Sequence, residues 1–250
     1  MSFADHFSSG ATDYARFRPG YPPALFEWLA TTVRQHRVAW DCATGSGQAA
    51  VGLAPHFDQV VATDGSAGQL AAAARHPTVG YACAVAERTP LGSEAVDVVT
   101  VAQALHWLPL DAFYDEVNRV VRRGGVVAVW SYGHASVAPA IAEVISAFYH
   151  GTIGEFWPAG RQHVENGYRD LPFPFAPIET PRFAMVRDWT VDELLGYIGT
   201  WSAVRRYRDA EGDAGVDSFM ARVRARWGEA MERRTVRWPL ALRVGHVAGR

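Results

Sequence analysis

The sequence predicts an α/β protein with a doubly wound, mostly parallel seven-stranded sheet and a helical cap. Three observations lead to this prediction. Apolar, β-branched runs alternate with segments of helical spacing through the first 150 residues. A glycine-rich turn directly follows the first of these runs. After residue 150 the alternation gives way to a stretch rich in glycine, proline and aromatic residues.

The apolar runs are continuous, which is typical of strands buried on both faces of a parallel sheet. We expect strands at residues 37–42, 59–64, 79–84, 96–101 and 125–131, with two more at 182–188 and 236–244. Helical spacing predicts helices at 22–35, 48–56, 67–75, 111–123 and 139–150. The helix at 111–123 is expected to end on Gly124 in a left-handed conformation. Repeated strand–helix–strand units require right-handed crossovers, and these produce a doubly wound sheet.

A chain of 250 residues suits one α/β core with an embellishment. The expected core comprises residues 37–150, 181–188 and 233–250. Residues 151–180 and 189–232 are expected to form a helical cap over the carboxyl edge of the sheet, and residues 1–36 an N-terminal arm and helix.

Composition excludes several classes of function. Basic and acidic residues nearly balance, 24 against 26, so no bulk field draws the chain to nucleic acid or to an anionic membrane. All the basic residues are arginine, which excludes a P-loop lysine, a Schiff-base lysine and a lysine general base. The scattered histidines and two cysteines predict no metal site. Without a signal peptide or an apolar run long enough for a membrane span, we expect a cytoplasmic protein.

The turn after the first predicted strand reads DCATGSGQ, from Asp41 to Gln48, and opens a helix. Gly45 and Gly47 allow the backbone to turn tightly and to approach a ligand where a Cβ atom would collide. Asp64 ends the next predicted strand, where a carboxylate accepts hydrogen bonds from ribose hydroxyls. Asp41 would repel a pyrophosphate but suits the ammonium group of a sulfonium amino acid. The pattern therefore predicts an adenosine-binding site.

This turn resembles motif I of the class I S-adenosylmethionine-dependent methyltransferases, with Ala43 in place of the first glycine. The resemblance continues in VATDGS at 61–66, AERTP at 86–90, QALHW at 103–107 and VVRRGG at 120–125. The segments at 14–22 and 200–204 resemble the trans-aconitate methyltransferase-like branch of the type 11 methyltransferases.

The resemblance implies a Rossmann-like fold with S-adenosyl-L-methionine as cofactor. It also implies that residues near Ala86 and Glu87 approach the adenine and that the N-terminal arm closes over the cofactor. The candidate cofactor-binding residues are Asp41, Ala43, Gly45, Gly47, Asp64, Gly65, Ala86, Glu87, Gln103, Tyr14 and Arg18.

Methyl transfer from a sulfonium is an in-line displacement, so the enzyme must mainly align the acceptor and exclude water. Gln103 and His106 are the candidate catalytic residues, because they follow the fourth predicted strand. His106 could take a proton from a hydroxyl or amine, position an already ionised carboxylate, or serve as a buried structural histidine. The candidate substrate-pocket residues are Tyr21, Trp107, Trp130, Tyr132, Trp157, Trp201 and Arg205. Core packing is the alternative for the aromatic side chains, and a solvated helix face is the alternative for Arg205.

We therefore expect an S-adenosylmethionine-dependent methyltransferase that acts on an oxygen, carboxylate or hydroxyl, of a small molecule. The alternatives are an NAD(P)-dependent oxidoreductase on a Rossmann fold and a non-catalytic S-adenosylmethionine-binding protein. The expected partner is a small-molecule methyl acceptor, with no nucleic acid and no membrane, and the expected state is a monomer or weak homodimer. The acceptor, the methylated atom and the use of a general base stay open at this point.

Overall fold

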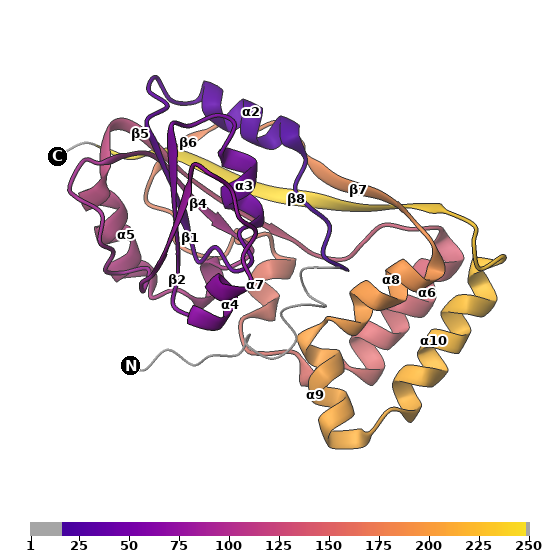
Figure 1. Cartoon of the computed structure of the whole chain (residues 1–250). Helices are drawn as coiled ribbons and strands as arrows, with labels where there is room; N and C mark the ends of the chain where they lie inside the picture. Colours follow the sequence, from indigo (N-terminus) through magenta and orange to yellow (C-terminus); the bar gives the residue numbers. More distant parts are fainter. Residues whose placement is uncertain (1–16, 249–250) are drawn as a thin grey trace.

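The structure is a computed structural model that describes residues 17–248. Its sheet has eight strands in the order β3-β2-β1-β4-β5-β8-β6, with β7 paired to β8 off this path (Figure 1). The strands are β1 (Val38–Cys42), β2 (Gln59–Asp64), β3 (Val79–Cys83), β4 (Val96–Ala102), β5 (Val121–Tyr132), β6 (Ala176–Ile178), β7 (Ala184–Trp189) and β8 (Arg234–His246). Strands β1 to β5 run parallel, and β8 is antiparallel to β5, β6 and β7. The predicted doubly wound, mostly parallel sheet is confirmed, with β6 as a short strand that the sequence did not predict.

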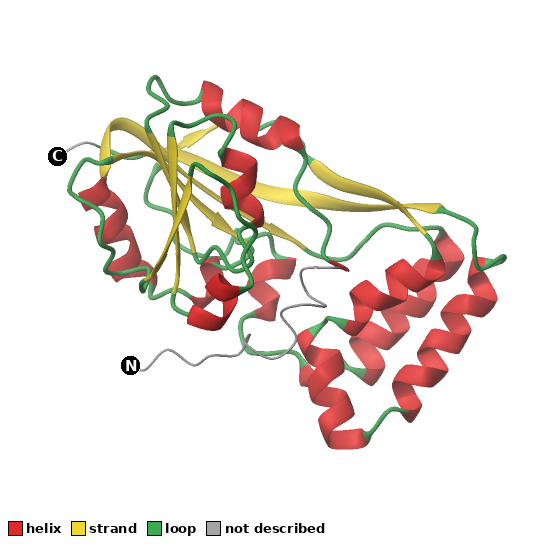
Figure 2. Ribbon diagram, viewed as in Figure 1, coloured by secondary structure: helices red, strands yellow, loops and turns green. Residues whose placement is uncertain are grey.

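The helices fall into a group beside the sheet and a group at the far end of β7 and β8 (Figure 2). They are α2 (Pro23–Thr31), α3 (Gln48–Leu53), α4 (Ala67–Ala71), α5 (Leu110–Val120), α6 (Pro139–Ala147), α7 (Arg161–Glu165), α8 (Val191–Gly199), α9 (Ser202–Glu211) and α10 (Ala214–Trp227). Short 3-10 turns lie at η1 (Leu105–Trp107) and η3 (Gly154–Phe156), and a π-helical turn, η2 (Phe148–Thr152), extends α6. None of the helices within residues 17–248 has the length and apolar composition needed to cross a bilayer.

The two faces of the parallel sheet are covered by different helices, which explains why the strand sequences are apolar throughout. On one face α2 and α3 pack Leu29 and Leu53 against β1, β2 and β5. On the other face α5 packs Phe113 and Val117 against Trp40 of β1 and its neighbours. Each such fully buried side chain contributes about 1.5–3 kcal/mol through removal of apolar surface from water.

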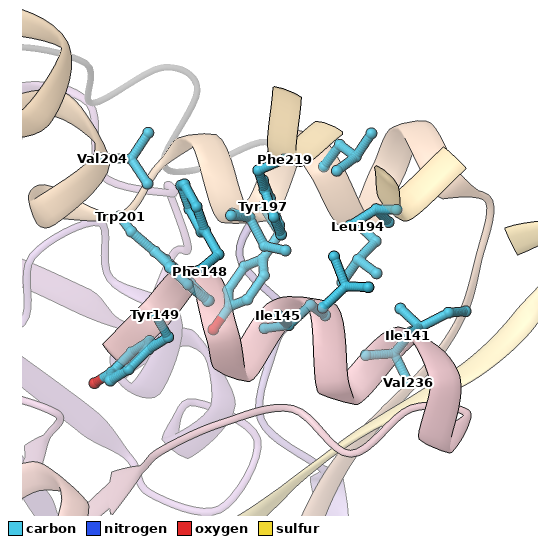
Figure 3. Close-up of a cluster of buried hydrophobic side chains, with 14 of the residues drawn as sticks. Ile141, Ile145, Phe148, Tyr149, Leu194, Tyr197, Trp201, Val204, Phe219 and Val236 are labelled. Atoms are coloured by element: carbon cyan, nitrogen blue, oxygen red, sulfur yellow. The ribbon is translucent and has the colours of Figure 1, made fainter. Parts of the chain in front are cut away.

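A third cluster of buried side chains holds the cap helices together (Figure 3). It joins α6, η2, α8 and α10 to β7 and the first half of β8. The rings of Phe148 and Phe219 stack with centroids 3.9 Å apart. Figure 1 shows β7 and β8 running from the core to these helices. The predicted assignment of residues to core and cap stays a prediction, although α6, expected in the core, packs against α10.

The predicted end of the helix at 111–123 is wrong. Helix α5 ends at Val120, and β5 begins at the next residue. Gly124 does adopt a left-handed conformation, with φ 81°, but it does so inside β5, where the pairing with β4 shifts. A Cβ atom at Gly125 would lie 2.7 Å from the carbonyl oxygen of Asp97. The glycines therefore form a β-bulge rather than a helix cap.

Candidate functional site

The turn between β1 and α3 lies at the carboxyl edge of the parallel strands. Gly45 and Gly47 have φ values of 55° and 80°, and Ala43 shares the left-handed region with φ 52°. A Cβ atom at Gly47 would lie 2.3 Å from the hydroxyl oxygen of Tyr81, whereas one at Gly45 would meet a single atom within 4 Å. Packing against Tyr81 thus requires a glycine at position 47. Within the part of the chain that the structure describes, the space beside Gly45 is open enough for a ligand to approach the backbone.

Asp64 ties this turn to the end of β2. Its Oδ2 accepts a hydrogen bond from the backbone N–H of Gly45 at 2.8 Å, and its Oδ1 accepts one from Ser66 at 2.8 Å. An ionised carboxylate offers about four acceptor positions, and these two hydrogen bonds fix its orientation at the turn. Gly65 lies between Asp64 and Ser66 in the same turn. This arrangement fits a ribose, whose paired hydroxyls need an acceptor beside the glycine turn.

Asp41 lies beneath the turn and is fully buried. Its two carboxylate oxygens accept hydrogen bonds from the hydroxyls of Thr44 and Thr100, the latter at 2.7 Å. Burial raises the pKa of Asp41 to about 6, and these hydrogen bonds oppose the shift. The carboxylate therefore stabilises the turn through its hydrogen bond with Thr44. Its contact with the ammonium group of the cofactor stays a prediction.

The predicted adenine segment follows β3. Ala86 is buried and Glu87 is exposed, in a turn closed by a bridge between Val85 and Arg88. Both residues lie after the carboxyl end of a strand next to β2, on the same edge as Asp64. The structure thus brings the predicted residues of β1, β2 and β3 to one edge, and their contacts with adenine stay a prediction.

Gln103 follows β4 with a φ of 59°. Its side-chain Nε2 donates to the Tyr132 carbonyl at 3.0 Å, and its Oε1 accepts from the Tyr132 N–H at 2.7 Å. The amide thus continues the pairing of β4 with β5 past the last backbone bond. Both ends of the side chain are engaged in this way, and the predicted roles of Gln103 in catalysis and cofactor binding stay predictions.

His106 lies on η1, just beyond β4, with its ring nitrogen Nδ1 3.0 Å from the hydroxyl of buried Tyr168. Burial, together with the positive charge of Arg161 and the neighbouring His163, lowers the pKa of His106 to about 4. The imidazole is therefore neutral at pH 7. Trp107, the next residue, lies with its ring centroid 4.7 Å from that of His106 and is 39% exposed.

The predicted pocket residues lie in separate groups. Tyr21, Trp130 and Tyr132 form one group, with Tyr21 and Trp130 ring centroids 5.3 Å apart and Trp130 fully buried. Arg18 joins this group, because its Nη1 donates to the Tyr132 hydroxyl at 2.9 Å. Tyr14 lies outside the described residues.

Trp157 and Trp201 form a second group, with ring centroids 5.7 Å apart. Tyr149 of η2 joins it, at 4.6 Å from the Trp157 centroid. Arg205, one turn of α9 after Trp201, lines a different hollow of about 360 Å³ beside α8 and α10. No sequence motif marks the π-helical turn, the short helix α7 or the loops beside them, so four residues near this group were not predicted: His134, Tyr149, Arg161 and Tyr168.

Comparison with known proteins agrees with this geometry. A family model described as a methyltransferase domain matches residues 40–129, which include the turn, β2 to β4 and most of β5. A Dictyostelium discoideum protein named as a methyltransferase is 33% identical over 80% of this chain and 78% of its own length. A Mycobacterium bovis protein, also named as a methyltransferase, is 35% identical over 50% of this chain and 51% of its own. A solved structure of a protein described as a type II methyltransferase from Anaeromyxobacter dehalogenans has 44% identity and a TM-score of 0.88, and the match covers 94% of this chain and 100% of that one.

The path of this chain agrees with that of the Anaeromyxobacter dehalogenans protein over nearly its whole length. The chain therefore belongs to the class I S-adenosylmethionine-dependent methyltransferases, enzymes whose cofactor is S-adenosyl-L-methionine.

Proposed function

We propose that the enzyme methylates an oxygen atom of a small molecule, and that this oxygen belongs to a carboxylate in preference to a hydroxyl. The observation that carries the proposal is the environment of His106. This side chain follows β4 at the cofactor edge, and its pKa of about 4 makes it a weak base at neutral pH. A carboxylate is already ionised at that pH and needs no base, so His106 would position the acceptor.

Two further features support a small acceptor. The chain has a net charge of −2, so no net positive field attracts a macromolecular polyanion such as RNA. The half-buried ring of Trp157, supported from behind by buried Tyr149 and Trp201, is an aromatic surface of the kind that lines small-molecule sites. We include in the proposal a cytoplasmic location, a monomeric or weakly dimeric state, no nucleic-acid or membrane partner, and membership of the trans-aconitate methyltransferase-like branch.

The proposal is tested by measuring S-adenosylhomocysteine production with matched acceptors. The panel contains aliphatic and aromatic carboxylic acids, the corresponding primary amides, phenols and a structured RNA. We expect turnover with one or more acids, none with the amides or the RNA, and an ester as the product by mass spectrometry. The rate should be level from about pH 7 to 8, because His106, the acid and Asp41, whose pKa is about 6, all titrate below this range. Turnover with phenols alone, rising with pH, would contradict the carboxylate preference.

A further inference from the structure

Arg161, the first residue of α7, lines an open hollow of about 350 Å³ between η2 and α7. Tyr149, Trp157 and Gly160 are among the other residues that line it. Figure 3 shows Tyr149 at the edge of the cap cluster, with its hydroxyl pointing away from the other labelled side chains. The hollow adjoins the proposed active site, because a Cβ atom at Gly160 would lie 3.6 Å from Cδ2 of His106.

The guanidinium of Arg161 is held on one side and free on the other. Its Cζ lies 4.5 Å from the ring centroid of Trp157 and 5.4 Å from that of Tyr149. Its Nε donates to the Tyr149 hydroxyl at 2.5 Å and lies 3.6 Å from a carboxylate oxygen of Glu165. In the part of the chain that the structure describes, Nη1 and Nη2 make no hydrogen bond. The side chain, 20% exposed, therefore offers an unused pair of donors in a fixed position.

The charges around Arg161 leave it as the cation of the hollow. His106 and His134 are neutral at pH 7, because burial and Arg161 itself lower the pKa of each. Glu165 is the opposing charge, and it accepts a hydrogen bond from the Tyr149 hydroxyl. His163 is paired with Asp170 at 2.7 Å and is turned to that partner. An anion that binds the free end of Arg161 gains two charge-assisted hydrogen bonds and competes with Glu165 for the same cation.

We propose that this hollow is a subsite for the methyl acceptor, in which Arg161 binds an anionic group through Nη1 and Nη2 while the apolar body of the acceptor packs on the half-buried ring of Trp157. This inference rests on the proposed function. The planar fork of arginine matches two oxygens of a carboxylate or of a phosphate, and aromatic faces bind flat apolar groups. The anionic group anchors the acceptor in the subsite, and the geometry of the guanidinium suits a carboxylate and a phosphate equally.

The test is calorimetric titration of the full chain with three probes: 3-phenylpropanoate, phenyl phosphate and the neutral 3-phenylpropanamide. Each titration is done with and without saturating S-adenosylhomocysteine. We expect one or both anions to bind and the amide to bind at least about tenfold more weakly. Preference between the two anions identifies the group that the subsite takes.

Two variants with opposite expected effects separate anion binding from a structural role of the Arg161–Tyr149–Glu165 group. Arg161→Gln should lower the affinity for the anions at least about tenfold and leave the affinity for the amide unchanged. Glu165→Gln should raise the affinity for the anions several-fold, because it removes the competing carboxylate while keeping an acceptor for the Tyr149 hydroxyl. Arg169→Gln, an exposed arginine bonded to the carbonyl of Asn166, is the matched control and should change nothing.

If the Arg161–Tyr149–Glu165 group has only a structural role, both variants should weaken anion binding or neither should. Either result would overturn the proposal. So would failure of the wild-type chain to bind any of the anions. If Arg161→Gln does not fold, the sign of the Glu165→Gln effect decides. Binding of anions without any methyl transfer would leave this subsite standing and refute the proposed function. Methyl transfer to an acid at a rate that Arg161→Gln does not change would support the proposed function and refute the subsite.

Discussion

Asp64 joins the turn after β1 to the end of β2 through two backbone N–H groups, and its carboxylate is the predicted acceptor for the ribose hydroxyls. In Asp64→Asn one oxygen becomes an amide nitrogen, which faces an N–H donor and cannot accept. We expect the affinity for S-adenosylhomocysteine to fall about 10- to 100-fold, as for the loss of hydrogen bonds to a charged group. Isothermal titration measures this. Asp58→Asn, at an exposed acid before β2, is the control, and equal affinities of the two variants would contradict the assignment.

Gly47 shows at one residue why the turn requires glycine. Its φ is 80°, and an added Cβ would lie 2.3 Å from the Tyr81 hydroxyl oxygen. We expect Gly47→Ala to lower the free energy of unfolding by about 1–3 kcal/mol, because strain and overpacking act together. Urea denaturation tests it. Tyr81→Phe in the same background should recover part of the loss, and a Gly47→Ala chain as stable as wild type would disprove the requirement.

His106 links stability to pH. Its pKa is about 4 in the folded chain and near 6.5 in the unfolded chain, so the unfolded chain takes up the proton first. The stability due to the neutral imidazole is complete above pH 6.5 and is lost as the pH falls from there toward 4. We therefore expect His106→Gln to lose less stability than wild type between pH 7 and 5, by denaturation at each pH. Parallel pH profiles for the two chains would show that His106 is not buried as described.

Prediction from sequence was most complete for the turn. Left-handed glycines at 45 and 47 and a carboxylate at 64 follow from the chemistry that an adenosine needs, so the pattern could be read directly. The surroundings of Asp41 and Gln103 could not be read in this way. Their partners, Thr100 and Tyr132, come from other strands, and no local pattern signals such pairings.

At the scale of elements, the cap depends on a few aromatic contacts between helices. The Phe148 and Phe219 rings stack at 3.9 Å with an interplanar angle of 11°, between η2 and α10. We expect Phe219→Ala to cost about 3–5 kcal/mol of stability, as for a large cavity in a core. Differential scanning calorimetry should show this loss, while Met231→Ala, at an 82% exposed side chain, should show none.

Phe219→Ala also tests whether the cap and the turn after β1 are energetically independent. No residue of the cap cluster belongs to the turn, so the affinity of Phe219→Ala for S-adenosylhomocysteine should remain within about twofold of wild type at temperatures where it is folded. A large loss of affinity would mean that the cap shapes the cofactor site.

Elements with a strong periodic pattern were predicted closely, and those governed by tertiary packing were not. Strand β2 has the predicted bounds, because its apolar run ends at an acid and a glycine. Helix α5 was predicted too long, since the run of arginines and glycines at 122–125 suits a helix end as well as a bulge. The short elements η2, α7 and β6 carry no periodicity of their own, so neither β6 nor the hollow between η2 and α7 was predicted.

At the scale of the whole molecule, the sheet order places the carboxyl ends of β1, β2, β3 and β4 at one edge. The pieces of the site come from distant parts of the chain, and parallel pairing alone brings them together. The position of the cap relative to this edge depends on β7 and β8. These strands pair residues 184–189 with residues 234–239. Sequence patterns predicted both strands but not that pairing.

A single-turnover reaction with isotope-labelled methyl cofactor tests whether the enzyme transfers a methyl group from S-adenosylmethionine to an oxygen of a small acid. The full chain is mixed with the acid panel, and the labelled product is identified by mass spectrometry. We expect labelled methyl esters together with stoichiometric S-adenosylhomocysteine, and loss of both in Asp64→Asn at limiting cofactor. Label on nitrogen or on RNA, or no S-adenosylhomocysteine with any acid, would contradict it.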